Sequence, residues 1–134
     1  MKGRVTFMDE TFNNNEKLYW AVYPQEVADM YWKIDGSISS AAFADPKGLS
    51  VDRGWYRSDD EVIVSMRKRF TGHIVSLYVR NCRDTGAIVR YLPSASNKYH
   101  SEIHGSESAP LLSKSQRRPL AKAAVVITPR PLDA

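Results

Sequence analysis

Apolar and polar residues alternate along the chain in a pattern that predicts a mixture of strands and short helices. Runs rich in aromatic and β-branched residues are typical of β-strands. Such runs occupy residues 18–23, 49–51, 74–79, 87–91 and 99–104. Residues 37–43 (SISSAAF) fit either a strand or an irregular segment, because small residues give little periodic signal.

Two segments in the first half of the chain show helical signals. In residues 25–34, apolar side chains occur at positions i, i+3, i+4 and i+7, which form one face of a helix. They are Val27, Met30, Tyr31 and Ile34. In residues 58–70, Ser58 and Glu61 have the spacing of a capping box, and apolar residues recur every four positions before Gly72. Both segments are predicted to be helices.

A third helix is predicted over residues 113–124. Ser113 and Gln116 repeat the capping-box spacing. Pro119 lies inside this segment, where a proline removes a backbone hydrogen bond and clashes with the preceding turn, so it either kinks the helix or restarts it. Together with the strands, these helices predict an α+β domain with a mainly antiparallel sheet of four to six strands, packed by two or three short helices.

The length of 134 residues suits a single domain. We expect a flexible N-terminal arm at residues 1–17, one α+β domain at 18–127 and a frayed C-terminal tail at 128–134. No apolar run approaches the roughly 20 residues of a membrane span, and the first residues lack the pattern of a secretory signal. With one cysteine, Cys82, no internal disulfide can form. These features predict a cytoplasmic protein with no membrane partner.

The net charge of +4 is mildly basic, and the cations are clustered. One group lies at the end of the second predicted helix and the other along the third. The members are Arg67, Lys68 and Arg69, and then Lys114, Arg117, Arg118 and Lys122. Clustered cations are typical of surfaces that bind a nucleic-acid backbone, which predicts nucleic acid as a partner, RNA more than DNA. The alternative is a non-catalytic accessory subunit whose partner is another protein.

The most suggestive cluster lies in the segment Tyr99–Gly105 (YHSEIHG). In a strand, side chains alternate, so His100, Glu102 and His104 would project from one face. In a helix, the two histidines would still lie one turn apart. Gly105 and the serine-rich flanks favour the strand. In either case both imidazoles can face a common site.

Three interpretations of this cluster compete. Two imidazoles, or one with Glu102, could transfer protons near neutral pH while Arg90 or Arg80 stabilises developing negative charge. That set suits a metal-independent ribonuclease, which needs no cofactor. The sequence H-x-E-x-H could instead bind zinc, although no cysteine or further histidine stands nearby in the sequence. In the third interpretation, the three residues are the solvated face of an edge strand.

A further resemblance concerns the order of three features along the chain. An aromatic strand at 19–23 is followed by Ser39-Ser40 and, on a late strand, by Glu102. This order resembles ADP-ribosyltransferases, which implies an enzyme of that type. The sequence departs from those enzymes because its first strand carries neither the arginine nor the histidine that they have there. No P-loop, G-x-G-x-x-G, C-x-x-C or H-E-x-x-H motif is present. The sequence therefore gives no motif-based support for dinucleotide binding of the Rossmann type, ATP binding or metalloprotease activity.

Overall fold

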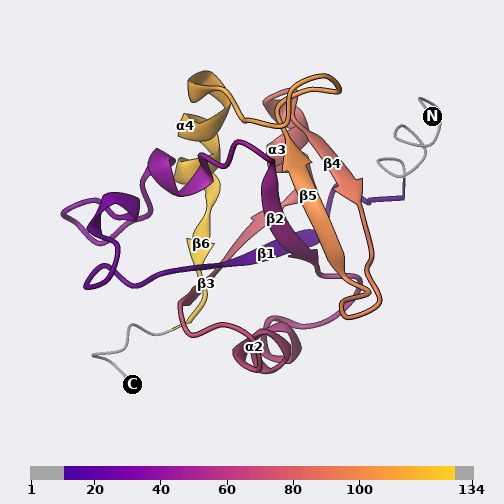
Figure 1. Ribbon diagram of the computed structural model, residues 1–134, viewed down its shortest axis with the longest axis horizontal. Helices are drawn as coiled ribbons and strands as arrows, with labels where there is room; N and C mark the ends of the chain where they lie inside the picture. The colour runs from indigo at the N-terminus through magenta and orange to yellow at the C-terminus, as the bar shows by residue number, and fades with distance from the viewer. Residues whose placement is uncertain (1–10, 129–134) are drawn as a thin grey trace.

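The computed structural model describes residues 11–128 and contains a six-stranded sheet (Figure 1). The strands are β1 (Lys17–Val22), β2 (Leu49–Arg53), β3 (His73–Tyr78), β4 (Ile88–Tyr91), β5 (His100–His104) and β6 (Val125–Val126). Their order across the sheet is β4-β5-β2-β1-β3-β6, and every neighbouring pair is antiparallel. The expected α+β class with a mainly antiparallel sheet is confirmed, as are all five strands expected from the sequence.

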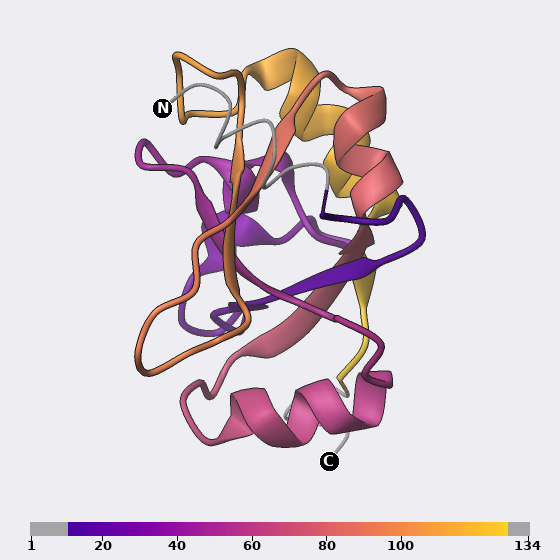
Figure 2. The same cartoon turned by 90° about the vertical axis from the view of Figure 1, so that its right-hand side faces the viewer.

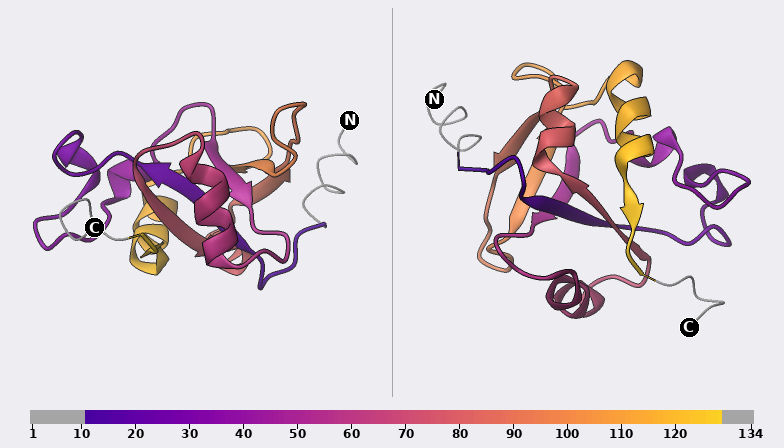
Figure 3. Two further views of the ribbon diagram at one scale, coloured as in Figure 1. Left: turned by 90° about the horizontal axis from the view of Figure 1, so that it is seen from below. Right: turned by 180° about the vertical axis from the view of Figure 1, so that it is seen from behind.

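Helices cover the two faces of the sheet unequally (Figures 2 and 3). On one face, α3 (Val79–Asp84), α4 (Lys114–Ala123) and the 3-10 turn η2 (Ser40–Phe43) enclose the main apolar core. On the other face, α2 (Asp59–Arg67) covers a smaller core. Because side chains alternate along a strand, Leu18 and Trp20 of β1 belong to the main core, whereas Tyr19 belongs to the core under α2.

Side chains at the helix starts explain why α2 and α4 begin where the sequence predicts. The Oγ of Ser58 accepts the backbone N–H of Glu61, and the Glu61 carboxylate accepts the N–H of Ser58. The same reciprocal pair forms between Ser113 and Gln116. Each pair satisfies two backbone donors that have no partner within the helix.

The end of α2 and the continuity of α4 could not be read from the spacing of residues in the sequence. α2 ends at Arg67, and Phe70, which continued the apolar repeat, is 40% exposed. Pro119 lies inside α4, which is assigned as one helix through Ala123, so the proline does not divide it.

The prediction of a helix over residues 25–34 is wrong. This segment contains only a 3-10 turn, η1 (Asp29–Tyr31), and its expected apolar face points into solvent: Val27, Met30 and Ile34 are 72, 69 and 103% exposed. Buried Trp32 fixes the segment instead, with its Nε1–H donating to the Tyr23 carbonyl oxygen. Tyr31, the fourth residue of that face, alone packs against the main core, so the spacing lacks the continuous buried face that stabilises a short helix.

Two segments expected to be loose belong partly to the fold. Phe12 is buried, and Glu16 forms an ion pair with buried Arg53, so the described part of the N-terminal arm is packed onto the sheet. At the other end, buried Thr128 accepts the backbone N–H of Ile74 through its Oγ1. The expectations for residues 1–10 and 129–134 lie outside the described residues.

The feature that creates a site is the separation of β1 from β2 in the middle of the sheet. These strands are joined only through the pairs Leu18↔Arg53 and Tyr19↔Asp52. Beyond them, β1 stays paired with β3 as far as Val22, and β2 stays paired with β5 back to Leu49. The sheet therefore opens between Trp20–Val22 on one side and Leu49–Val51 on the other.

Candidate functional site

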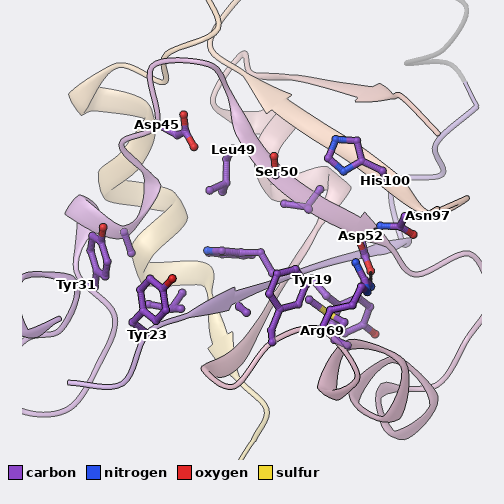
Figure 4. A pocket seen from close by; sticks show the side chains of 17 residues that line it. Tyr19, Tyr23, Tyr31, Asp45, Leu49, Ser50, Asp52, Arg69, Asn97 and His100 are labelled. Atoms are coloured by element: carbon purple, nitrogen blue, oxygen red, sulfur yellow. Dashed lines mark hydrogen bonds and ion pairs between the residues drawn. The ribbon is translucent and has the colours of Figure 1, made fainter. Parts of the chain in front are cut away.

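A cleft of about 340 Å³ occupies the opening between β1 and β2 (Figure 4). Because the strands diverge there, side chains from both faces of the sheet line it. Tyr23 and Tyr31 lie toward one end, with Asp45 above them in the view, and the polar groups Asp52 and His100 lie toward the other end. The cleft therefore has an aromatic end and a polar end. The remaining aromatic lining comes from Tyr19, Trp20 and Phe70.

The polar end is organised around the carboxylate of Asp52, a residue that is 4% exposed. Arg69 donates from Nη2 to one carboxylate oxygen at 2.6 Å, and Asn97 donates from Nδ2 to the other at 2.8 Å. Asp52 also pairs in register with His100 of β5. Residues directly opposite each other in an antiparallel pair point to the same face, so Asp52 and His100 share this end of the cleft.

The cluster predicted on β5 is brought together as expected for a strand. His100, Glu102 and His104 share one face, and Glu102 lies between the two imidazoles. Its Oε1 is 2.8 Å from the Nε2 of His104, and its Oε2 is 3.4 Å from the Nε2 of His100. Because a carboxylate only accepts hydrogen bonds, each Nε2 carries the proton in this arrangement. The two histidines together fix the orientation of the Glu102 carboxylate.

The two histidines are placed differently. The His100 side chain is 29% exposed and lines the cleft, whereas the His104 side chain is 9% exposed. Gly48 lies against the His104 ring so closely that a Cβ there would lie 2.6 Å from the imidazole. His104 is therefore a positioning group for Glu102, and His100 is the histidine that a ligand in the cleft can reach.

Ser50 and Arg90 flank Glu102 on the neighbouring strands. Ser50 of β2 and Arg90 of β4 are its register partners, and Ser50 also lines the cleft. Glu102 thus lies beside two lining residues, Ser50 and its hydrogen-bond partner His100. The Nη2 of Arg90 donates to the Glu107 carbonyl oxygen, so this guanidinium is engaged with the following loop. Arg80, the other predicted cation, has its guanidinium 5.9 Å from the Tyr78 ring, at the start of α3.

The serine that lies near Glu102 is not the one that the ADP-ribosyltransferase resemblance suggested. Ser39 and Ser40 lie at the start of η2, where the Ser39 Oγ donates to the Met30 carbonyl oxygen. The site contains Ser50 instead. The alternating polar residues Ser50 and Asp52 on β2 match His100 and Glu102 on β5, and this shared alternation was the available signal.

The two clusters of cations do not form one surface. Arg67 and Lys68 lie at the end of α2, whereas Lys114, Arg117, Arg118 and Lys122 lie on α4, which packs on the opposite face of the sheet. Only Arg69 from these groups lines the cleft, and its charge is paired with Asp52. Lys114, Arg118 and Lys122 are exposed and spaced by four residues, so they form a basic stripe along α4.

Tyr19, one of the lining residues, is fixed by its phenol. Its O–H donates to the Asp59 carboxylate at 2.6 Å, and Lys17 forms an ion pair with the same carboxylate. Burial, together with this hydrogen bond, raises the pKa of Tyr19 above its ordinary value. The hydrogen bond from Tyr19 lowers the pKa of Asp59, so the pair holds the protonated phenol and the ionised carboxylate.

Within residues 11–128, no three His, Cys, Asp or Glu side chains are arranged as ligands of one metal ion. The zinc interpretation of the β5 cluster therefore gains no ligand set from the described residues. None of the helices described could span a lipid bilayer, since the longest contains only 10 residues.

Comparison with known proteins does not assign the site. No family model, no curated protein and no solved structure matches the chain.

Proposed function

We propose that the protein breaks the bond between ribose and pyridine in a nicotinamide dinucleotide and passes the ADP-ribosyl group to water or to an acceptor. The observation that supports this proposal is the Glu102 carboxylate, fixed by two imidazoles and lying beside Ser50 and His100, which line the cleft. A fixed carboxylate suits a reaction in which positive charge develops on a sugar carbon, because it stabilises that charge without reorganising.

The charge of the cleft favours a substrate with a cationic ring. Asp45 and Asp52 line it, and the positive charge of the lining residue Arg69 is paired with Asp52. Aromatic rings attract cations through their faces, so a pyridinium group is favoured by both kinds of lining side chain. A long polyanion such as an RNA backbone gains less from this lining.

The chemistry divides between the residues of β5. As the glycosidic C–N bond breaks, its electron pair leaves with nicotinamide, which becomes neutral, and Glu102 stabilises the positive charge on the ribosyl carbon. The oxygen or nitrogen of the nucleophile then bonds to that carbon, and its proton passes to Glu102 or His100. Ser50, opposite Glu102, is placed to orient the carboxylate or the ribose, and His104 holds the carboxylate in position.

The ADP-ribosyltransferase resemblance included a serine and a glutamate. The site has both, with Glu102 as expected and with Ser50 instead of Ser39-Ser40 as the serine. The first strand still carries neither the arginine nor the histidine of those enzymes. Tyr19 and Ala21 of β1 line the cleft, and Arg69, which follows α2, is the one Lys or Arg among its lining residues. Only the Nη2 of Arg69 binds Asp52, so the remaining donors of its guanidinium are the candidates for contacting the pyrophosphate.

A ribonuclease remains the second candidate because one observation favours it. His100 and Glu102 are hydrogen-bonded and both partly exposed, at 29 and 23% of their side chains, which gives an acid–base pair that a phosphodiester could reach. In that case the basic stripe on α4 would bind RNA separately, since it lies on the other face of the sheet.

One experiment compares these candidates directly. The protein is incubated with chelator and either a nicotinamide dinucleotide or labelled RNA, and free nicotinamide and shortened RNA are quantified. We expect nicotinamide release that falls by about 10² to 10⁴ in Glu102→Gln. The matched control is Glu107→Gln, an exposed carboxylate in the loop after β5, which should keep full activity.

Each other outcome has a definite meaning. RNA cleavage without nicotinamide release rejects the dinucleotide and supports the ribonuclease. If neither RNA cleavage nor nicotinamide release is observed, the result supports the accessory-subunit interpretation. Nicotinamide release that Glu102→Gln leaves unchanged places the active site elsewhere.

A further inference from the structure

A second groove, of about 670 Å³, shares the lining residue Tyr19 with the cleft but none of the others. Its volume lies within the range of roughly 300–1,000 Å³ that is usual for ligand sites. Three aromatic side chains of its lining are exposed: Tyr56 is 97%, Trp55 40% and Tyr78 39% exposed. Large aromatic side chains gathered around one exposed groove are typical of a surface that binds a partner.

The loop between β2 and α2 holds two of these aromatic residues in an unfavourable backbone conformation. Trp55 and Tyr56 have φ values of +49° and +69°. This left-handed region favours glycine and is costly for a bulky residue, so it persists only where surrounding contacts enforce it. The Tyr56 ring lies in solvent and gains no burial in return. Backbone strain of this kind gathers at sites that bind ligands.

The contacts that enforce this conformation fix the loop before any ligand arrives. The backbone N–H of Trp55 donates to the Glu16 carboxylate at 3.1 Å. Arg57 donates from Nε and Nη2 to the carbonyl oxygens of Gly54 and Arg53. The Arg53 guanidinium lies over the Trp55 ring, 4.8 Å from its centroid. A surface that is already ordered loses little freedom on binding, which favours affinity.

The carboxylates of the groove are largely neutralised within the protein. Glu16 forms an ion pair with buried Arg53, and Asp59 forms one with Lys17. The third carboxylate of the lining, Asp60, is exposed, so water and salt screen its charge. The charge that a partner meets therefore depends mainly on the cations around the groove.

Two arginines supply that positive charge. Arg57 lines the groove and donates to neutral carbonyl oxygens. Exposed Arg80 lies beside the groove, with its guanidinium 5.9 Å from the ring centroid of the lining residue Tyr78. Cations interleaved with aromatic rings match a nucleic-acid strand, whose phosphates are anionic and whose bases stack on aromatic faces. An uncharged glycan would use the rings but not the cations.

We infer that this groove binds single-stranded nucleic acid, with an unpaired base stacked on Tyr56 and the backbone phosphates near Arg57 and Arg80. The strand must be single, because the bases of a duplex are already paired and stacked on one another. This inference goes beyond the reaction proposed for the cleft, and that reaction can fail without affecting it. It also does not use the basic stripe on α4.

The test measures affinity by fluorescence anisotropy for labelled oligo-dT and oligo-U of about 12 nucleotides and for a DNA duplex of the same length. The wild type should bind a single strand more tightly than the duplex, and the tighter of the two single strands identifies the kind of nucleic acid. Tyr56→Ala should weaken binding about fivefold to 150-fold, the effect of one base stacked on an aromatic ring. Tyr56→Phe should keep the wild-type affinity, as should Tyr23→Ala, which removes another exposed tyrosine.

Two further variants separate binding from folding and charge from stacking. Tyr56→Gly suits the left-handed backbone, so it should lose affinity like Tyr56→Ala while urea denaturation shows that it stays folded. Arg80→Gln should reduce the slope of log affinity against log salt by about 0.7, the value of one phosphate contact on a single strand. Arg118→Gln, on the basic stripe of α4, should leave that slope unchanged.

Several results would overturn the inference. These are no binding of either single strand, equal affinity for the duplex, or wild-type affinity in Tyr56→Ala. Affinity that does not change with salt would overturn it as well and would indicate an uncharged partner such as a glycan. A loss of affinity in Arg118→Gln but not in Tyr56→Ala would assign nucleic acid to the α4 stripe instead.

Discussion

The two faces of the sheet are built from the same strands, yet one is a continuous apolar core and the other is a divided surface. Under α3 and α4, most inward side chains of β1, β2, β3 and β5 are apolar, and the buried polar ones are Arg53, His73 and Ser101. On the opposite face, α2 is only nine residues long and covers β1 and β3, where Tyr19 and Ile74 lie. Over β2 and β5 that face carries Ser50, Asp52 and Glu102 instead. The polar end of the cleft thus lies where the covering helix does not reach, beside the separation of β1 from β2.

The difference between the two faces should be largest when substitutions at two neighbouring residues of β5 are compared for their effect on the free energy of unfolding. Ile103 is fully buried in the main core, whereas Glu102 points to the other face with 23% of its side chain exposed. Ile103→Ala should lower the free energy of unfolding by about 2–5 kcal/mol, through lost burial and the cavity left behind. Glu102→Gln should cost no more than about 1 kcal/mol, because the side chain keeps its volume and is partly solvated. Urea denaturation measures both, and equal losses would contradict the division.

The next largest loss of stability should come from a substitution at Gly48, which should also lower activity. Gly48 has a φ of +99° and contacts the His104 ring, so Gly48→Ala both strains the backbone and displaces the imidazole that holds Glu102. The matched control is Gly86→Ala, because Gly86 has a φ of +79° and an added Cβ would meet none of the described atoms within 4 Å.

Both alanine variants should lose about 1–2 kcal/mol of stability through their left-handed backbone. Only Gly48→Ala should lose more than that and also reduce nicotinamide release. A Gly48→Ala variant with the stability and turnover of Gly86→Ala would show that His104 does not position Glu102.

A site residue could be predicted from the sequence when its position depends on one strand, but not when it depends on how two strands pair. The positions of His100, Glu102 and His104 followed from β5 alone, because alternation in a strand holds whatever its neighbours are. Ser50 and Asp52 became site residues only through the register of β2 with β5, and a shift of one residue would have turned them to the other face. Sequence spacing does not contain that register.

Arg69 and Trp20 illustrate two further limits. Arg69 lies beyond the end of α2, so its contact with Asp52 depends on where the chain turns back toward β3. Trp20 is a core residue by its position in β1, and only the separation of β1 from β2 lets it line the cleft. The fold class was predictable from local patterns, whereas the cleft depended on how two strands diverge.

A smaller effect is expected from Asp59, whose carboxylate connects the start of α2 to Tyr19. Its pKa is lowered in the folded protein, chiefly by the Tyr19 hydrogen bond, so its contribution to stability is present above its ordinary pKa and is lost as pH falls toward the folded value. The wild type should therefore lose stability as pH decreases below about 5. Asp59→Asn should show a shallower decline in urea midpoints between pH 5 and pH 3. Asp60→Asn, the next residue and an exposed one, should keep the slope of the wild type.

The smallest effect is expected where helical spacing predicted a helix that is not there. Ile34 is 103% exposed, whereas Ile38, four residues later, is 3% exposed and belongs to the main core. Ile34→Ser should change the free energy of unfolding by no more than about 0.5 kcal/mol, as for other surface substitutions, because it removes no buried contact. Ile38→Ser should cost several times more, because it leaves a cavity and buries a hydroxyl. Urea denaturation of the two variants decides the matter: a large loss in Ile34→Ser would mean that residues 25–34 pack as a helix after all.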